Sequence, residues 1–115
     1  VEAPERAAAL RAAGAEIVTL ANPAGKVDLA ALLQELGRRG INELHAEAGH
    51  KLNGSLLREG LVDEFLFYLA PCLIGDNAAG LFTLPALTTL ADKRALKILD
   101  LRQVGPDIRL IARPV

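Results

Sequence analysis

Apolar residues in the first two-thirds of the chain recur with two alternating periods, one typical of helices and one of strands. A first helix is predicted from Pro4, which a first turn tolerates, and Gly14 is placed to end it. A second helix is predicted after Asp28, a candidate N-cap, with leucines at helical spacing as far as Leu36. A third helix is predicted roughly from His50 to Glu59.

Three runs of strand length separate and follow these helices. They are Glu16–Leu20, the run INELHAE at 41–47, and the apolar run Asp63–Pro71, whose composition predicts a central strand covered on both faces. Alternation of helix and strand predicts parallel strands joined by right-handed crossovers. The fold class is therefore predicted to be α/β, with a layered sheet and flanking helices.

The last third of the chain follows a different pattern. Gly75–Gly80 reads as a loop, and Pro85 interrupts the run that follows it. RALKILDLRQV and DIRLIAR then flank Gly105-Pro106 and alternate apolar with polar residues, which predicts a C-terminal antiparallel hairpin. Residues 1–115 contain no repeat and no linker, so a single domain is predicted.

Composition narrows the classes of function. Hydrophobic residues make up 51% of the 115 residues, enough for one core, but the aromatic share of 3% argues against base stacking on aromatic platforms. The net charge of -1 predicts neither a nucleic-acid nor a membrane partner. One cysteine and no signal peptide predict a cytoplasmic protein. The absence of methionine predicts a fragment of a longer protein.

The densest group of chemically useful residues is LHAEAGHKLNG, residues 44–54. His45, Glu47 and His50 are candidate metal ligands, and His-x-Glu followed later by Pro-Cys partly matches a zinc deaminase signature. The second cysteine of that signature falls at Gly75, which leaves two protein ligands where a catalytic zinc needs three. No metal site is predicted.

The same stretch is a candidate anion site. A strand that passes through Ala48 and Gly49 directly into a helix presents the first-turn N–H groups, and Lys51 adds a positive charge. The alternative is that the glycine only makes the turn compact. Glu47, at the end of the predicted strand, is a candidate to position a substrate or to transfer a proton. The alternative is that it is a solvated strand-end carboxylate.

The run from Glu47 to Leu110 contains E-A-G followed by L-x-G-x-L-L, then G-L-V-D-E, Y-L-A-P-x-L-I-G, G-L-F-x-L-P and V-G-P-D, in that order. It resembles the carboxyl-terminal part of the reductase domain of bacterial bifunctional riboflavin-biosynthesis deaminase/reductases. Residues before Glu47 resemble that family more loosely. The family often has Glu-Gly-Gly at positions 47–49 and Pro-Thr at 50–51, where this chain differs. Its domain also carries first strands and substrate-phosphate residues before the point at which this chain begins.

The resemblance implies a dihydrofolate-reductase-like fold, incomplete at its N-terminus, and NADPH-dependent reduction of 5-amino-6-(5-phosphoribosylamino)uracil to the ribitylamino product. It implies that Glu47 lies in the catalytic region and that the cofactor contacts the loop and helix start, namely Ala48, Gly49, His50, Lys51 and Leu52. It also implies a homodimer. Two alternatives stay open: a related NADPH reductase with another substrate, and a non-catalytic oligomerisation module.

Overall fold

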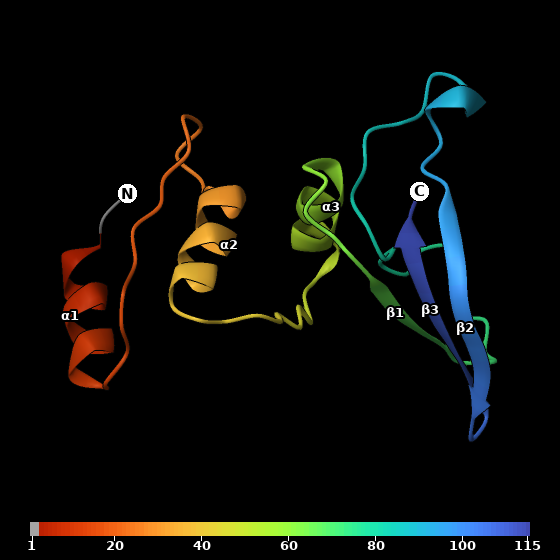
Figure 1. Cartoon of the computed structure of the whole chain (residues 1–115), viewed down its shortest axis with the longest axis horizontal. Coiled ribbons are helices and arrows are strands. Elements are labelled where there is room, and N and C mark those ends of the chain that lie inside the picture. Colours follow the sequence, from red (N-terminus) through yellow and green to blue (C-terminus); the bar gives the residue numbers. More distant parts are fainter. Residues whose placement is uncertain (1–2) are drawn as a thin grey trace. The chain divides into compact units, whose positions relative to one another are not determined.

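The computed structural model describes residues 3–115. The chain divides into two compact units, a first that ends at His45 and a second from Ala46 to Val115 (Figure 1). The elements, in order, are α1 (Pro4–Ala12), α2 (Leu29–Arg38), α3 (His50–Arg58), β1 (Phe65–Leu69), the short 3₁₀ helix η1 (Leu90–Asp92), β2 (Leu96–Val104) and β3 (Asp107–Pro114). No helix in the described part of the chain has both the length and the apolar character to span a membrane.

All three predicted helices are confirmed. Pro4 lies in the first turn of α1, and the chain leaves this helix through Gly14 at φ +87°. The carboxylate of Asp28 caps α2 by accepting from the backbone N–H of Ala31 at 2.9 Å. One face of α2 is apolar, and Leu29 is its buried residue. Local signals for helix start and stop are thus sufficient to predict these elements.

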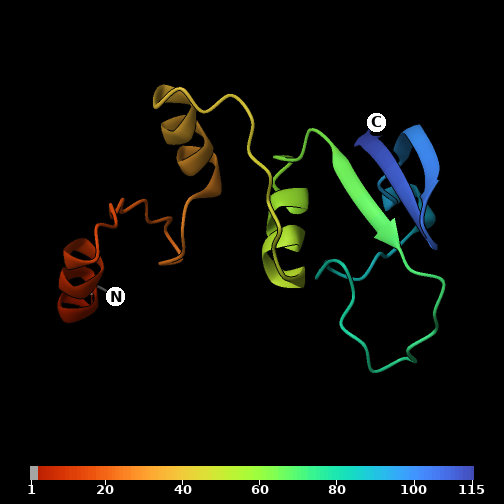
Figure 2. The ribbon, with the colours of Figure 1, turned by 90° about the horizontal axis from the view of Figure 1, so that it is seen from below.

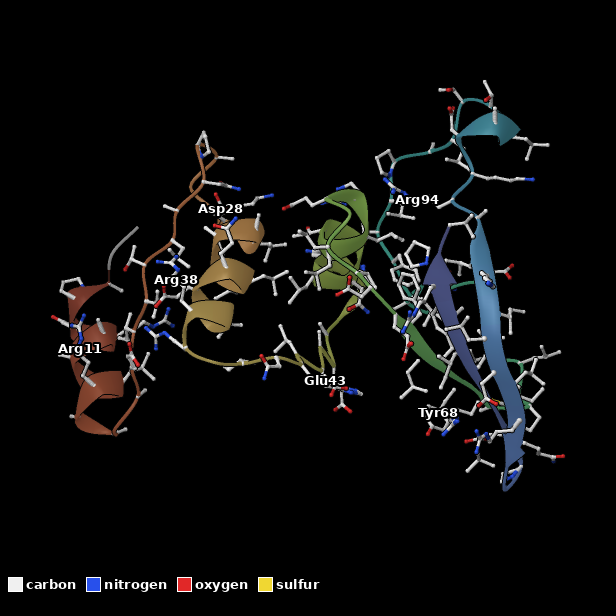
Figure 3. All side chains as sticks on the ribbon, viewed as in Figure 1. Arg11, Asp28, Arg38, Glu43, Tyr68 and Arg94 are labelled. Carbon is white, nitrogen blue, oxygen red and sulfur yellow. The ribbon has the colours of Figure 1, made fainter. Side chains whose placement is uncertain are left out.

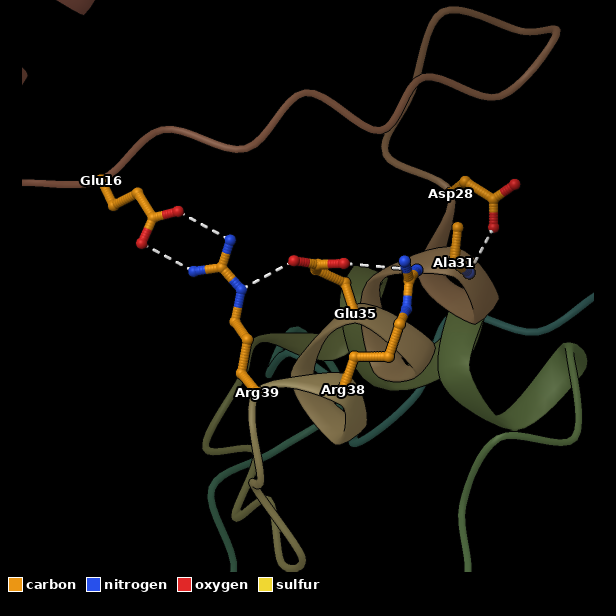
Figure 4. Close-up of polar contacts among 6 residues, drawn as sticks. All are labelled: Glu16, Asp28, Ala31, Glu35, Arg38 and Arg39. Carbon is orange, nitrogen blue, oxygen red and sulfur yellow. Dashed lines mark hydrogen bonds and ion pairs between the residues drawn. The ribbon is translucent and has the colours of Figure 1, made fainter.

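Arg39 connects the end of α2 to the extended segment that precedes it (Figure 4). Its guanidinium donates to both carboxylate oxygens of Glu16 at 2.6 Å, and its Nε donates to Glu35 at 2.8 Å. These hydrogen bonds lower the pKa of both carboxyls and raise the pKa of Arg39. The three side chains hold residues 16 and 39 together, 23 positions apart in sequence.

The second unit contains a three-stranded antiparallel sheet in the order β1-β3-β2 (Figure 2). The predicted hairpin is confirmed: β2 and β3 pair from Leu96↔Pro114 to Val104↔Asp107, with a register shift between Ile98 and Asp100. Gly105 begins the two-residue turn at φ +59°, a conformation that glycine adopts without the steric cost of a Cβ.

Three phenylalanines form a cluster at the start of β1. The rings of Phe65 and Phe67 stack with centroids 5.3 Å apart, and Phe82 meets both edge-on at 5.7 and 6.3 Å. Such edge-to-face pairs are favourable because the positive ring edge meets the negative ring face. Phe65 is buried, as is Ala112, its partner on β3. This cluster and the centre of β3 form the core of the second unit.

The prediction of parallel strands was wrong for residues 3–115, where β3 pairs antiparallel with both β1 and β2. The runs 16–20 and 41–47 are extended but carry no strand, and Ala21 forms only an isolated bridge with Val27. The run Asp63–Pro71 contributes the shorter strand β1, which lies at an edge of the sheet, not at its centre. Strand-like composition yields a strand only where a partner aligns its N–H and C=O groups.

Candidate functional site

The candidate site lies where the extended segment before α3 turns into that helix. Gly49 is the N-cap residue of α3, at φ −75° and ψ 166°, and it has no side chain with which to accept from the first-turn N–H groups. A shallow, open pocket of about 300 Å³ follows, lined by Ala48, Gly49, His50, Lys51 and Leu52. The family resemblance implies that these same five residues lie at a cofactor.

The charge of α3 suits an anion. The helix carries Lys51 in its first turn and Arg58 in its last, and its sequence HKLNGSLLR contains no carboxylate. The positive end of the helix dipole and Lys51 therefore act in the same direction at the pocket. Lys51 is exposed, so its ammonium group is accessible to a ligand.

Space at Gly49 is open. A Cβ built on this residue meets no atom within 4 Å, and the backbone angles are ones that any residue adopts. Glycine is therefore not required there by the packing of the chain itself. Its absent side chain leaves the backbone open to close approach by a ligand.

His50 contacts a segment that lies far from it in sequence, and the Asn53 side chain links Ala48 to the same segment. The ring Nδ1 of His50 lies 2.6 Å from the hydroxyl of Thr83, and the backbone N–H of Thr83 donates to the His50 carbonyl at 2.8 Å. The side-chain amide of Asn53 donates to the carbonyls of Ala48 at 3.0 Å and of Leu81 at 3.3 Å. Neither Asn53 nor Thr83 is among the site residues predicted from the sequence.

The far end of α3 is also fixed. Arg58 donates to the Thr83 carbonyl at 2.8 Å and to the Ser55 hydroxyl at 2.8 Å, while Arg94 donates to the Arg58 carbonyl at 3.5 Å. Figure 3 labels Arg94 on the chain segment that precedes β2. Hydrogen bonds to residues 81–94 thus hold both ends of the helix.

Glu47 and His45 lie in the extended segment that leads to α3, not on a strand, and both side chains are exposed. Each takes part in interactions within the chain. Glu47 directly precedes the pocket-lining residues in sequence. Among residues 3–115 there is no group of three or more His, Cys, Asp and Glu side chains placed to hold a metal ion.

The fold and the site thus describe an α/β domain with a glycine loop at a helix N-terminus, and comparison with known proteins identifies its family. The RibD C-terminal domain family matches residues 2–110, and the chain belongs to that family. The resemblance inferred from the sequence motifs is therefore confirmed.

Individual relatives agree. Over 86 residues the chain is 49% identical to the riboflavin biosynthesis protein RibD of Escherichia coli, covering 75% of this chain and 23% of the relative. Over 89 residues it is 37% identical to the 5-amino-6-(5-phosphoribosylamino)uracil reductase of Buchnera aphidicola, covering 77% of this chain and 43% of the relative. The chain therefore spans less than half the length of either relative.

A solved structure gives the same result for the fold. Acinetobacter baumannii RibD superposes with a TM-score of 0.73 at 35% sequence identity, covering 78% of this chain and 25% of that protein. This likeness confirms the predicted fold class of helices around a layered sheet, of which this chain holds a part.

Proposed function

We propose that this chain is the carboxyl-terminal part of a reductase domain that binds NADPH and reduces 5-amino-6-(5-phosphoribosylamino)uracil in riboflavin biosynthesis. The observation that carries the proposal is the pocket at the start of α3, lined by residues 48–52, in a chain whose family includes a reductase of that name. Relatives that are reductases support a nicotinamide cofactor in general, and NADPH is our more specific proposal.

The residues present fit the phosphates of such a cofactor. The first-turn N–H groups of α3 and the Lys51 ammonium are donors suited to one anionic group, and the open space at Gly49 would let that group approach the backbone closely. His50 and Leu52 complete the lining of the pocket, and Ala48 leaves room for close approach because its side chain is small. These five residues would hold the cofactor.

NADPH supplies a hydride, so the chain's own work is to bind and orient the reactants. Glu47 precedes the cofactor loop directly, and we propose that it holds or moves a proton beside the reacting sugar carbon. Holding the loop against α3 would orient the cofactor, which removes part of the entropy cost of bringing it to the substrate.

Titration of the chain with NADPH, followed by the fluorescence of the reduced nicotinamide, tests the proposal. Saturable binding is expected, with weaker binding of NADH, which lacks the additional phosphate. Absence of saturable NADPH binding would exclude the cofactor assignment and favour a non-catalytic oligomerisation module. Binding of NADPH without turnover of the uracil substrate by the complete domain would instead favour a reductase with another substrate.

Gly49→Val is the sharpest substitution for this site. Because a Cβ at residue 49 meets no protein atom, we expect the variant to fold as the wild type does while its side chain obstructs the phosphates. NADPH affinity should fall by about tenfold or more, by loss of one or more charge-assisted hydrogen bonds.

Gly37→Ala is the matched control, since a Cβ at this helical glycine also meets nothing within 4 Å. It should leave the dissociation constant unchanged. Equal NADPH affinity for Gly49→Val and the wild type would place the phosphates elsewhere.

We also propose that residues 1–115 form one domain, that the protein is cytoplasmic and that two copies associate as a homodimer. Exposed leucines and isoleucines on the hairpin, such as Ile98 and Leu101, supply apolar surface for such an association. Sedimentation equilibrium over a range of concentrations measures the mass directly, and a monomer at every concentration would contradict the homodimer.

A further inference from the structure

Residues 81–83 form a short segment, here called the brace, which contacts both the sheet and α3. On the sheet side, Phe82 packs edge-on against Phe65 and Phe67 of β1. Aromatic contacts of this kind fix a ring in position as well as burying apolar area. The brace is therefore anchored to the most buried part of the second unit.

On the helix side, the two flanking residues of the brace contact the first turn of α3. The backbone N–H of Thr83 donates to the His50 carbonyl at 2.8 Å, and the Thr83 hydroxyl lies 2.6 Å from Nδ1 of the His50 ring. The Leu81 carbonyl accepts from the Asn53 amide, which also donates to the carbonyl of Ala48. Through these bonds the brace reaches Ala48 and His50, two of the residues that line the pocket.

Gly54 explains how the brace comes so close. A Cβ built on this helical glycine would collide with the backbone carbonyl oxygen of Thr83 and lie 2.9 Å from its carbonyl carbon and nitrogen. Glycine inside a helix is less favourable than alanine, so its presence calls for a reason. Here that reason is the close approach of Thr83.

The first turn of a helix needs such support if it is to bind an anion. Its N–H groups lack intrahelical acceptors and its backbone frays more readily than the helix centre. In α3 the N-cap Gly49 contributes no side-chain hydrogen bond that would fix the turn. The brace provides that restraint from outside the helix.

We propose that Thr83 is a positioning residue, whose hydroxyl holds His50 and the first turn of α3 in the geometry that the cofactor phosphates require. This inference rests on the proposed function, because it concerns the affinity of the same pocket for NADPH. Thr83 does not line the pocket and acts through His50.

Two substitutions at residue 83 test the role of the hydroxyl. Thr83→Val keeps the branched shape and the backbone N–H but removes the hydroxyl, whereas Thr83→Ser keeps the hydroxyl. The dissociation constant for NADPH should rise roughly three- to tenfold in Thr83→Val, the effect of one hydrogen bond, and return to near the wild-type value in Thr83→Ser.

Amide hydrogen exchange supplies a readout that needs no cofactor. The N–H of Asn53 donates to the Gly49 carbonyl and reports on the first turn of α3. Without NADPH, its exchange should be roughly three- to tenfold faster in Thr83→Val and normal in Thr83→Ser. Exchange in β3, measured in the same sample, should stay unchanged if the effect is local.

The outcomes separate the two proposals. Failure of the wild-type chain to bind NADPH would overturn the proposed function and, with it, the link from Thr83 to the cofactor. Tight binding by the wild type with equal affinity in Thr83→Val would overturn the positioning role alone. Equal losses in Thr83→Val and Thr83→Ser, or faster exchange throughout β3, would also overturn it, because the effect would then be a general loss of stability.

Discussion

Asp100 accepts hydrogen bonds from two arginine side chains of the hairpin. Its carboxylate accepts from Arg102 at 2.9 Å and from Arg109, on the neighbouring strand β3, at 2.7 Å. The hydrogen bond from Arg102 and then that from Arg109 lower the pKa of Asp100 below its usual range. The pKa of Arg109 is raised, mainly by its hydrogen bond to Asp100, and Tyr68, labelled in Figure 3, contributes to the same shift.

The depressed pKa of Asp100 makes part of the stability dependent on pH. Because the folded state favours the ionised carboxylate, the contribution is present above the unfolded pKa of about 4 and is lost as the pH falls through the lower folded value. Asp100→Asn should therefore unfold at lower urea concentration than the wild type at pH 7, and the difference should vanish near pH 2. The side chain is 32% exposed, so high salt should reduce the effect. Equal urea midpoints at pH 7 in low salt would contradict this account.

Helix α3 illustrates what a sequence predicts at the scale of an element and what it does not. Its start at His50 and the glycine loop before it follow from local signals, as does the turn at Gly105 between β2 and β3. Thr83 was missed because it meets His50 across 33 positions, from a segment without regular structure. The one local hint was Gly54, a glycine inside a helix, which often marks a close backbone approach.

The sequence likewise predicts some of the strands and not others. β2 and β3 were predictable because they pair with each other, are adjacent along the chain and are joined by a two-residue turn. The runs 16–20 and 41–47 have strand composition, but no residue within 3–115 pairs with them in a ladder. β1 pairs with β3 about 40 positions away, a choice that its own sequence does not encode.

Gly54→Ala is the prediction that belongs to α3 as a whole. Alanine raises helix propensity by about 1 kcal/mol, yet its Cβ would collide with the backbone of Thr83. We expect the brace to move away from the helix, so that urea stability falls and NADPH affinity falls with it. Gly37→Ala in α2 has the same gain in propensity and open space around its Cβ, so it should stabilise the chain by up to about 1 kcal/mol. A stability gain in both variants would show that the close approach at Gly54 is absent in solution.

Few side chains are buried in the part of the chain that the structure describes. Among the described residues the buried hydrophobic side chains are Leu29, Leu57, Phe65 and Ala112, whereas many large ones are exposed. Only Leu29 belongs to the first unit, and the other three belong to the second. Because so few apolar side chains of residues 3–115 are buried, hydrophobic burial contributes little to the stability of these residues.

This distribution of buried residues predicts how the chain unfolds. A unit of about 45 residues with one buried leucine lacks the core to undergo a cooperative transition alone. Under the single-domain proposal we expect one heat-absorption peak in calorimetry, with equal calorimetric and van't Hoff enthalpies. Amide exchange in α2 should then report the same unfolding free energy as exchange in β3. A second peak, or loss of α2 protection while β3 remains protected, would show that the two units unfold separately and would contradict the single-domain proposal.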